Sequence, residues 1–213
     1  PLFRSSAASD VYKRQHLAND STHQGKWEKP KFIGTELKGK TLGIVGYGNI
    51  GQRVAEICST IGMKIITNSK SASDDDLSKF DVKKVSTEEL IKEADIISPH
   101  TKLNDETKYM INKETISTMK PTSVIINCAR GGLINEFDLK DALNNEIIAG
   151  AAIDVYENEP ATDNIMFGTK NLLLTPHLGA SSKEAQSNVA IDVANQVADF
   201  LKENKIVNNV NSF

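Results

Sequence analysis

The sequence predicts an α/β protein with a doubly wound parallel sheet and part of a second domain. From Thr41 onward, short apolar runs rich in β-branched residues alternate with segments of helical periodicity, which is the chain order of a parallel sheet with crossover helices. The runs are continuous rather than alternating in polarity, as expected for strands that are covered on both faces. A glycine motif at 46–51 joins the first run to the first helix.

The expected strands are short and alternate with the expected helices. Strands are predicted at Thr41–Gly46, Lys64–Thr67, Asp95–Ser98, Ser123–Cys128, Ile148–Asp154 and Leu172–Thr175. Helices are predicted over Ile50–Ile61, from a cap at Ser86 or Thr87 through Ala94, from a cap at Asn135 through Leu143, and from Ser182 to about Asn204. The last helix carries one apolar stripe, which we expect to pack into a core, and which consists of Ala185, Val189, Val193, Val197 and Leu201.

Composition and charge exclude several classes of protein. The 213 residues include 25 Lys and Arg against 28 Asp and Glu, a formal net charge of −3, so the basic surface that nucleic acids and anionic membranes need is not expected. The longest apolar run, Ile147–Ile153, is far too short to span a bilayer. The two cysteines, Cys58 and Cys128, indicate neither a disulfide framework nor a zinc site, which favours a cytoplasmic protein without a metal.

The sequence pattern divides the chain into three parts. Residues 1–15 show no helix or strand period and end with a basic cluster, Lys13 and Arg14, so we expect a non-native junction or a frayed, disordered terminus. Residues 16–180 carry the alternating pattern and form the expected nucleotide domain. Residues 181–213 hold the long final helix and the segment after it.

The glycine motif has the spacing G-x-G-x-x-G, with its glycines at Gly46, Gly48 and Gly51. Its place after a predicted strand and before a predicted helix predicts a Rossmann-type dinucleotide-binding domain. In that setting Gly46 permits the tight turn, Gly48 lets the backbone approach a pyrophosphate, and Gly51 allows close packing of helix on strand. The N–H groups and the positive dipole end at the start of the helix then face the phosphates.

The residues after the second strand leave the choice between NAD and NADP open. An Asp or Glu about 20 residues beyond the glycines normally binds the adenosine ribose hydroxyls. Here the strand Lys64–Thr67 is followed by Asn68, Ser69 and Lys70. Serine does not repel a 2′-phosphate and Lys70 would attract one. These residues therefore leave NAD and NADP both open. NAD is the expected cofactor because the family resemblance described below implies it, and NADP is the alternative.

Three polar residues follow strands that end at the expected ligand edge of the sheet. Arg130 lies in Cys-Ala-Arg-Gly-Gly, Glu159 in Asp-Val-Tyr-Glu-Asn-Glu-Pro, and His177 in Thr-Pro-His-Leu-Gly-Ala. The carboxyl ends of parallel strands are where such sheets bind ligands. From spacing alone, a shared site and three ordinary surface residues both remain open.

Four segments resemble the D-isomer-specific 2-hydroxyacid dehydrogenase family: GKWEKPKFIGTELKGKTLGIVGYGNIG, INCARGGLINEFDL, AAIDVYENEP and LLLTPHLGASSKEAQ. The resemblance runs from about Lys26 to Phe213. It implies hydride transfer between a nicotinamide cofactor and a small D-2-hydroxy or 2-oxo acid. The expected reaction is oxidation of 3-phosphoglycerate to 3-phosphohydroxypyruvate, a step of serine biosynthesis. A glyoxylate or hydroxypyruvate reductase and a non-catalytic dinucleotide-sensing protein are the alternatives.

The resemblance also implies roles for particular residues. His177 would exchange a proton with the substrate hydroxyl or carbonyl, Glu159 would orient His177 and favour its charged form, and Arg130 would hold the substrate carboxylate. Main-chain amides of Asn49 and Ile50 would bind the pyrophosphate, whereas the side chain of Cys128 fits a core position equally well. The full set of expected cofactor contacts is Gly46, Gly48, Asn49, Ile50, Gly51, Ser69, Lys70, Thr101, Cys128, Arg130, Asp154 and His177, with Asp154 on the nicotinamide carboxamide.

Family proteins build a second, substrate domain mainly from a long segment before the nucleotide domain and complete it with the final helix and strand. That preceding segment is absent from this sequence. The resemblance therefore implies a fragment with weak or no turnover. It also implies a homo-oligomer that associates through the nucleotide domain.

Overall fold

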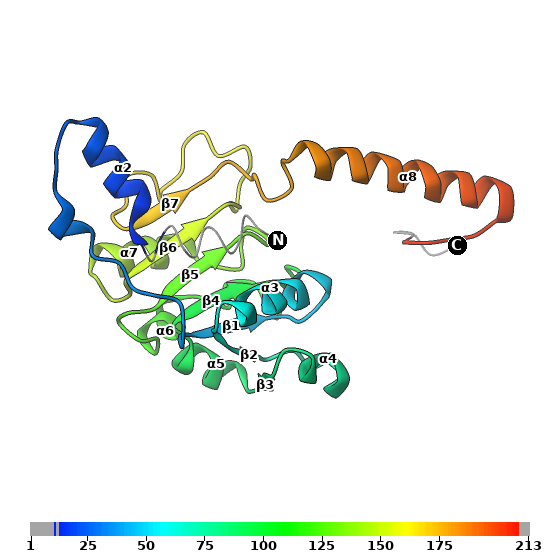
Figure 1. The fold of residues 1–213 in the computed structure, drawn as a ribbon, viewed down its shortest axis with the longest axis horizontal. Helices are drawn as coiled ribbons and strands as arrows, with labels where there is room; N and C mark the ends of the chain where they lie inside the picture. The colour runs from blue at the N-terminus through cyan, green and yellow to red at the C-terminus, as the bar shows by residue number, and fades with distance from the viewer. Residues whose placement is uncertain (1–10, 12, 209–213) are drawn as a thin grey trace. The chain divides into compact units, whose positions relative to one another are not determined.

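The structure, a computed structural model, describes residue 11 and residues 13–208. The chain forms two compact units, one ending at Pro176 and the other beginning at His177. The first unit holds the sheet and most of the helices, and the second holds one long helix (Figure 1).

A seven-stranded sheet, parallel throughout, forms the centre of the first unit. Its strands are β1 (Thr41–Val45), β2 (Lys64–Thr67), β3 (Val82–Lys84), β4 (Ile96–Pro99), β5 (Val124–Asn127), β6 (Gly150–Ile153) and β7 (Leu172–Leu174). They lie in the order β3-β2-β1-β4-β5-β6-β7, so the chain runs outward from β1 on one side and from β4 on the other. Leu42 pairs with Ile65 in β2 and with Ile96 in β4. The predicted doubly wound sheet is confirmed, with its switch point between β1 and β4, where such folds bind ligands.

Helices connect most of these strands. They are α2 (Gln15–His23), α3 (Asn49–Thr60), α4 (Asp74–Ser78), α5 (Thr87–Glu93), α6 (Lys113–Ser117), α7 (Glu136–Asn144) and α8 (Lys183–Glu203), with a short 3-10 helix η1 (Lys29–Phe32). The Ser86 side chain accepts a hydrogen bond from the Glu89 N–H, and the Asn135 side chain accepts one from the Asp138 N–H. The caps expected at Ser86 and Asn135 are therefore confirmed, and they satisfy N–H groups that a first helical turn leaves without partners.

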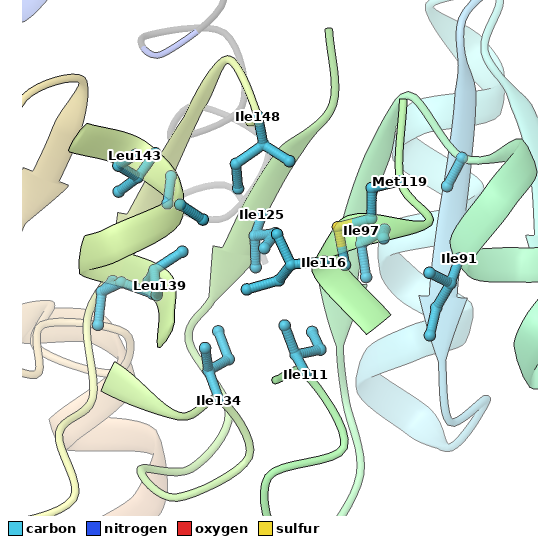
Figure 2. Packing of buried hydrophobic residues seen from close by; sticks show 14 of the residues in the cluster. Ile91, Ile97, Ile111, Ile116, Met119, Ile125, Ile134, Leu139, Leu143 and Ile148 are labelled. Atoms are coloured by element: carbon cyan, nitrogen blue, oxygen red, sulfur yellow. The ribbon is translucent and has the colours of Figure 1, made fainter. Parts of the chain in front are cut away.

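Two apolar clusters cover the two faces of the sheet. In β4, Ile96 belongs to one cluster and its neighbour Ile97 to the other, and Val124 and Ile125 of β5 divide in the same way. Successive side chains of a strand point to opposite faces, so both faces of these strands are buried, as the continuous apolar runs predict. Figure 2 shows the second cluster, in which Ile125 is joined by residues of α6 and α7 that include Ile116, Leu139 and Leu143.

The elements that the sequence did not predict are short or polar: α2, η1, α4, β3 and α6. In β3, Val82 is buried and the two remaining residues, Lys83 and Lys84, are exposed. An element of this length gives no periodic signal. It becomes a strand because its backbone pairs with β2, from Ile65 to Thr67.

The long final helix is confirmed, but its apolar stripe is not packed as expected. No residue of α8 is buried, and Val189 and Leu201 expose 60% and 76% of their surface. The expectation that the stripe packs into a core of this chain is therefore wrong. A helical period shows that one face is apolar, but it does not show whether the surface that covers this face belongs to the same stretch of chain.

The expected leader, residues 1–15, falls mainly on residues 1–10 and 12, which lie outside the described residues. Val11 is 8% exposed and belongs to the first apolar cluster. Arg14 donates a hydrogen bond of 3.3 Å to the side chain of Asn171, next to β7. Val11 and Arg14 thus contact other residues of the first unit, to which they belong, and the boundary at residue 15 stays a prediction.

An ion pair links three strands at their amino ends. The Asp95 carboxylate accepts the Thr41 N–H at 2.8 Å and lies 3.0 Å from the Lys120 ammonium group. Burial raises the pKa of Asp95, but the contacts with Thr41 and Lys120 outweigh burial and hold the pKa below its usual value. A carboxyl group with a lowered folded-state pKa adds stability above its unfolded-state pKa, and this stability is lost as the pH falls through the folded-state pKa.

We expect Asp95→Asn to lower the free energy of unfolding by about 1–2 kcal/mol at neutral pH, because a charge-assisted contact is lost. The difference from the parent chain should shrink as the pH falls below about 4, the usual pKa of an Asp carboxyl, and onward through the lower folded-state pKa of Asp95. Urea unfolding followed by circular dichroism over this range measures both effects. Asp105→Asn, at an exposed carboxylate, is the control, and a difference that does not change with pH would contradict the assignment.

Candidate functional site

The glycine motif forms a tight turn between β1 and α3 at the switch point of the sheet. Gly46 has a φ of +87°, and a Cβ atom there would lie 2.9 Å from the His100 carbonyl oxygen and 3.3 Å from the Thr101 Cβ. A Cβ atom on Gly51 would lie 2.5 Å from the Gly46 carbonyl oxygen. The tight turn and the close packing expected at these glycines are thus present, with Thr101 beside them. Their part in binding a cofactor stays a prediction.

The start of α3 leaves a space that suits a diphosphate. Gly48 is the N-cap residue and supplies no capping side chain, and a Cβ atom there would meet nothing within 4 Å. Asn49 and Ile50 follow in the first turn and are exposed. The N–H groups of a first turn have no partner within their own helix, and the helix dipole favours an anion beside them. The residues present therefore fit the pyrophosphate of a dinucleotide.

The end of β2 carries an amide, a hydroxyl and an ammonium group. Asn68 accepts a hydrogen bond from the Gly46 N–H at 3.4 Å and donates one to the Thr87 hydroxyl at 2.9 Å. Ser69, the next residue, is buried, and Lys70 is exposed. Asn68 thus links the glycine turn to the end of β2, which places Ser69 and Lys70 at the same edge of the sheet.

A buried amide shapes the turn that carries Arg130. The side chain of Asn127, at the end of β5, accepts the Ala129 N–H at 3.0 Å and donates to the Arg130 carbonyl oxygen at 2.9 Å. Asn127 is 2% exposed, whereas Arg130 is exposed. The backbone of this turn is therefore held from inside the protein, while Arg130 lies at the surface where an anion can reach it.

The turn after β5 packs backbone to backbone against the loop after β6. A Cβ atom on Gly131 would lie 1.8 Å from the Tyr156 carbonyl oxygen and 2.7 Å from the Glu157 nitrogen. No side chain fits into that gap, so only glycine allows the approach. Arg130 and Glu159 belong to these two loops, and both therefore lie at the carboxyl edge of the sheet.

A hydrogen-bond network holds the loop of Glu159. The Glu159 carboxylate accepts the Tyr156 N–H at 2.9 Å, and the Tyr156 hydroxyl donates to the Thr175 carbonyl oxygen at 3.0 Å. The Thr175 hydroxyl in turn donates to the Asp154 carboxylate at 2.6 Å, and Asp154 is 1% exposed. Burial is the main cause that raises the pKa of Tyr156, and nearby carboxylates such as Asp154 raise it further. Its hydroxyl therefore stays protonated and continues to donate.

His177 is the first residue of the second unit. It follows β7 by three residues, is exposed, and has a φ of 55°, a backbone conformation that is uncommon for residues other than glycine. The expected pairing of His177 with Glu159 joins residues of different units and stays a prediction.

The two cysteines are both buried. Burial raises the pKa of Cys58 to about 11. Cys128 is 6% exposed and belongs to the first apolar cluster, so its side chain takes the core position that the sequence left open. Among the described residues, no group of three or more His, Cys, Asp or Glu side chains is placed to hold a metal ion. None of the described helices combines the length and the apolar character needed to cross a membrane.

Sequence reasoning missed the residues that hold the two loops. Asn127, Tyr156 and Thr175 were read only as parts of strands or motifs. Tyr109, whose φ is 50°, was also missed, and its hydroxyl donates to the Glu157 carboxylate. One signal was available, because Asn127 is a polar residue at the end of a run of buried apolar residues, and such a residue needs hydrogen-bond partners.

The fold and the site define the first unit as a dinucleotide-binding domain, because an open glycine turn without a capping side chain lies at the switch point of a parallel sheet. The family described as "D-isomer specific 2-hydroxyacid dehydrogenase, NAD binding domain" matches residues 6–179. The chain belongs to this family, whose members are oxidoreductases that use NAD.

Similar proteins carry the names of a dehydrogenase and of two different reductases. The chain is 45% identical to a D-3-phosphoglycerate dehydrogenase of Synechocystis sp., over 86% of this chain and 33% of the relative. It is 43% identical to a hydroxypyruvate reductase of Thermotoga maritima, over 86% of this chain and 60% of the relative. A crystal structure of a glyoxylate reductase from Paecilomyes thermophila matches with a TM-score of 0.90 and 30% identity, over 97% of this chain and 63% of that one. The chain thus spans about a third of the length of the Synechocystis relative.

We expect Gly131→Ala to lower the free energy of unfolding by about 2 kcal/mol or more, because the added methyl group forces two backbone segments apart. Thermal unfolding followed by circular dichroism measures the change. The matched control is Gly48→Ala, where the methyl group meets nothing within 4 Å and stability should change by about 0.5 kcal/mol or less. Equal stability of the two variants would contradict the close packing described for Gly131.

Proposed function

We propose that this chain is the nucleotide-binding part of a D-3-phosphoglycerate dehydrogenase, which oxidises 3-phosphoglycerate to 3-phosphohydroxypyruvate in serine biosynthesis. One observation carries the proposal: the carboxyl edge of the sheet combines an open glycine turn with the loops of Arg130 and Glu159. The edge thus offers a dinucleotide cradle together with a cation and a carboxylate. The identity to the Synechocystis relative of that name supports the choice of substrate.

The cofactor is held at two places. Main-chain groups of Gly48, Asn49 and Ile50 bind the pyrophosphate at the start of α3. Asp154 binds the nicotinamide carboxamide, and its carboxylate is fixed by the hydroxyl of Thr175. When bound, the nicotinamide supplies the hydride acceptor in oxidation and the donor in reduction.

The substrate is held and deprotonated by three residues. Arg130 binds the substrate carboxylate through its planar guanidinium group and polarises the reacting C–O bond. His177 takes the hydroxyl proton in oxidation and returns it in reduction. Glu159, which the Tyr156 N–H holds in place, orients the imidazole and stabilises its charged form.

Two other functions compete with this one. The Thermotoga relative and the Paecilomyes structure carry the names of a hydroxypyruvate reductase and a glyoxylate reductase, and these favour the small 2-oxo acids as alternative substrates. A non-catalytic dinucleotide sensor would need the cradle alone, so the presence of Arg130, Glu159 and His177 favours an enzyme. Cytoplasmic location and association through the nucleotide domain stay predictions. Size-exclusion chromatography with light scattering would test the association by measuring the oligomeric state.

We expect Gly48→Ala to keep the fold but to weaken NADH binding by about tenfold or more, since the methyl group takes the space proposed for the pyrophosphate. Enhancement of NADH fluorescence on titration with the chain measures the affinity. Gly25→Ala is the inverse control, because Gly25 has a φ of +73° with nothing within 4 Å. It should lower stability and leave NADH affinity unchanged. NADH affinity that is equal in the parent and Gly48→Ala would refute the cradle.

Turnover tests the catalytic assignment in a chain completed with the substrate-domain segment of the Synechocystis relative. His177→Asn should lower kcat by about 100-fold or more and leave the Kd for NADH unchanged, because the proton acceptor is lost. Arg130→Gln should raise KM for the hydroxy acid, because the carboxylate loses its partner. Comparison of kcat/KM for 3-phosphoglycerate, hydroxypyruvate and glyoxylate separates the candidate substrates. Unchanged turnover of His177→Asn would show that the assignment is mistaken.

A further inference from the structure

The side chain of Lys84 contacts the backbone of Lys70 beside the end of β2. The ammonium group of Lys84 donates a hydrogen bond of 3.3 Å to the carbonyl oxygen of Lys70. This contact follows from the parallel pairing of β2 and β3, in which Lys84 lies opposite Thr67. Both lysines are exposed. The loop after β2 therefore carries its own ammonium group and holds a second one from the neighbouring strand.

This loop lies where a dinucleotide domain contacts the adenosine ribose. Asn68 is 22 positions beyond Gly46 and accepts a hydrogen bond from its N–H. That separation matches the place, about 20 residues on, at which such domains carry the acid that binds the ribose hydroxyls. The hydrogen bond joins the loop to the glycine turn, so Ser69 and Lys70 follow at the place where such domains carry that acid, which is their ribose subsite.

The subsite offers hydrogen-bond donors and positive charge but no acid. Residues 68–73 contain no Asp or Glu. The hydroxyls of Ser69 and Ser71 lie 3.3 Å apart, and each can turn its proton toward an acceptor. The carboxylates of Asp74–Asp76 begin α4, and Asp76 is already engaged by Lys79 at 2.7 Å and by the Ser73 hydroxyl.

We propose that this subsite accepts a 2′-phosphate on the adenosine ribose, with Ser69, Lys70 and Lys84 as its partners. The chain then binds NADPH at least as tightly as NADH. This inference rests on the proposed function, since it presumes that a nicotinamide dinucleotide lies in the cradle. The physical reason is that an acid at this position repels a phosphate dianion, whereas two ammonium groups and a hydroxyl attract it.

The experiment compares four ligands by isothermal titration calorimetry on the 213-residue chain: NADH, NADPH, ADP-ribose and 2′-phospho-ADP-ribose. The last two isolate the ribose end, because they lack the nicotinamide. Each 2′-phosphorylated ligand should bind at least as tightly as its partner. The advantage should decrease as the salt concentration rises, because exposed charge pairs are screened.

Variants of the two lysines identify the groups that meet the phosphate. Lys70→Gln and Lys84→Gln should each weaken NADPH binding roughly three- to tenfold and change NADH binding by about twofold or less. Lys64→Gln is the matched control, because it makes the same change of charge on an exposed lysine at the other end of β2 and should change neither affinity.

Ser69→Asp restores the acid and should reverse the preference in favour of NADH. Ser69 is 8% exposed, so its fold is checked by circular dichroism. If this variant does not fold, Lys70→Glu at an exposed position makes the same test.

The outcomes separate the inference from the proposed function. NADH binding that is measurably tighter than NADPH binding overturns the inference and leaves the dehydrogenase proposal standing. NADPH affinity that is unchanged in both lysine variants also overturns it. Binding of neither dinucleotide overturns the cradle itself, and the inference fails with it.

Discussion

The site depends on backbone segments that approach one another more closely than any side chain would permit. Gly46 lies against the carbonyl of His100, Gly51 against the carbonyl of Gly46, and Gly131 against the carbonyl of Tyr156. Each contact draws a loop at the carboxyl end of one strand onto the loop or helix beside it. A hydrogen atom is the largest substituent that fits at these positions. The distances between the loops are therefore set by the glycines and not by side chains that could adjust their packing.

The fold could be predicted from the sequence because its signals are local and repeated. Continuous apolar runs reveal strands covered on both faces, and caps such as Ser86 and Asn135 mark where helices begin. The glycine turn was also predictable, since its spacing and its position after a strand are both visible in the chain. The strand β3 was not, because it forms by pairing with β2 and holds one buried residue, Val82.

The loops of the candidate site could be predicted from the sequence, but the hydrogen bonds that hold them could not. The positions of Arg130 and Glu159 at the carboxyl edge of the sheet could be predicted because each follows a buried strand. The bonds that orient their loops join residues that no local pattern connects: the Tyr156 hydroxyl reaches the carbonyl oxygen of Thr175, 19 positions away. The prediction that the apolar stripe on α8 packs into a core was wrong for a related reason. Periodicity describes one helix and not the surface that covers it.

The ion pair of Asp95 lies at the opposite end of the strands from the glycine turn. Asp95 and Lys120 precede β4 and β5, whereas His100 and Arg130 follow those same strands. Each strand thus separates residues that stabilise the sheet from residues at the proposed ligand edge. A substitution at one end of a strand can therefore change how well the sheet resists heat or acid without altering the loops at the other end.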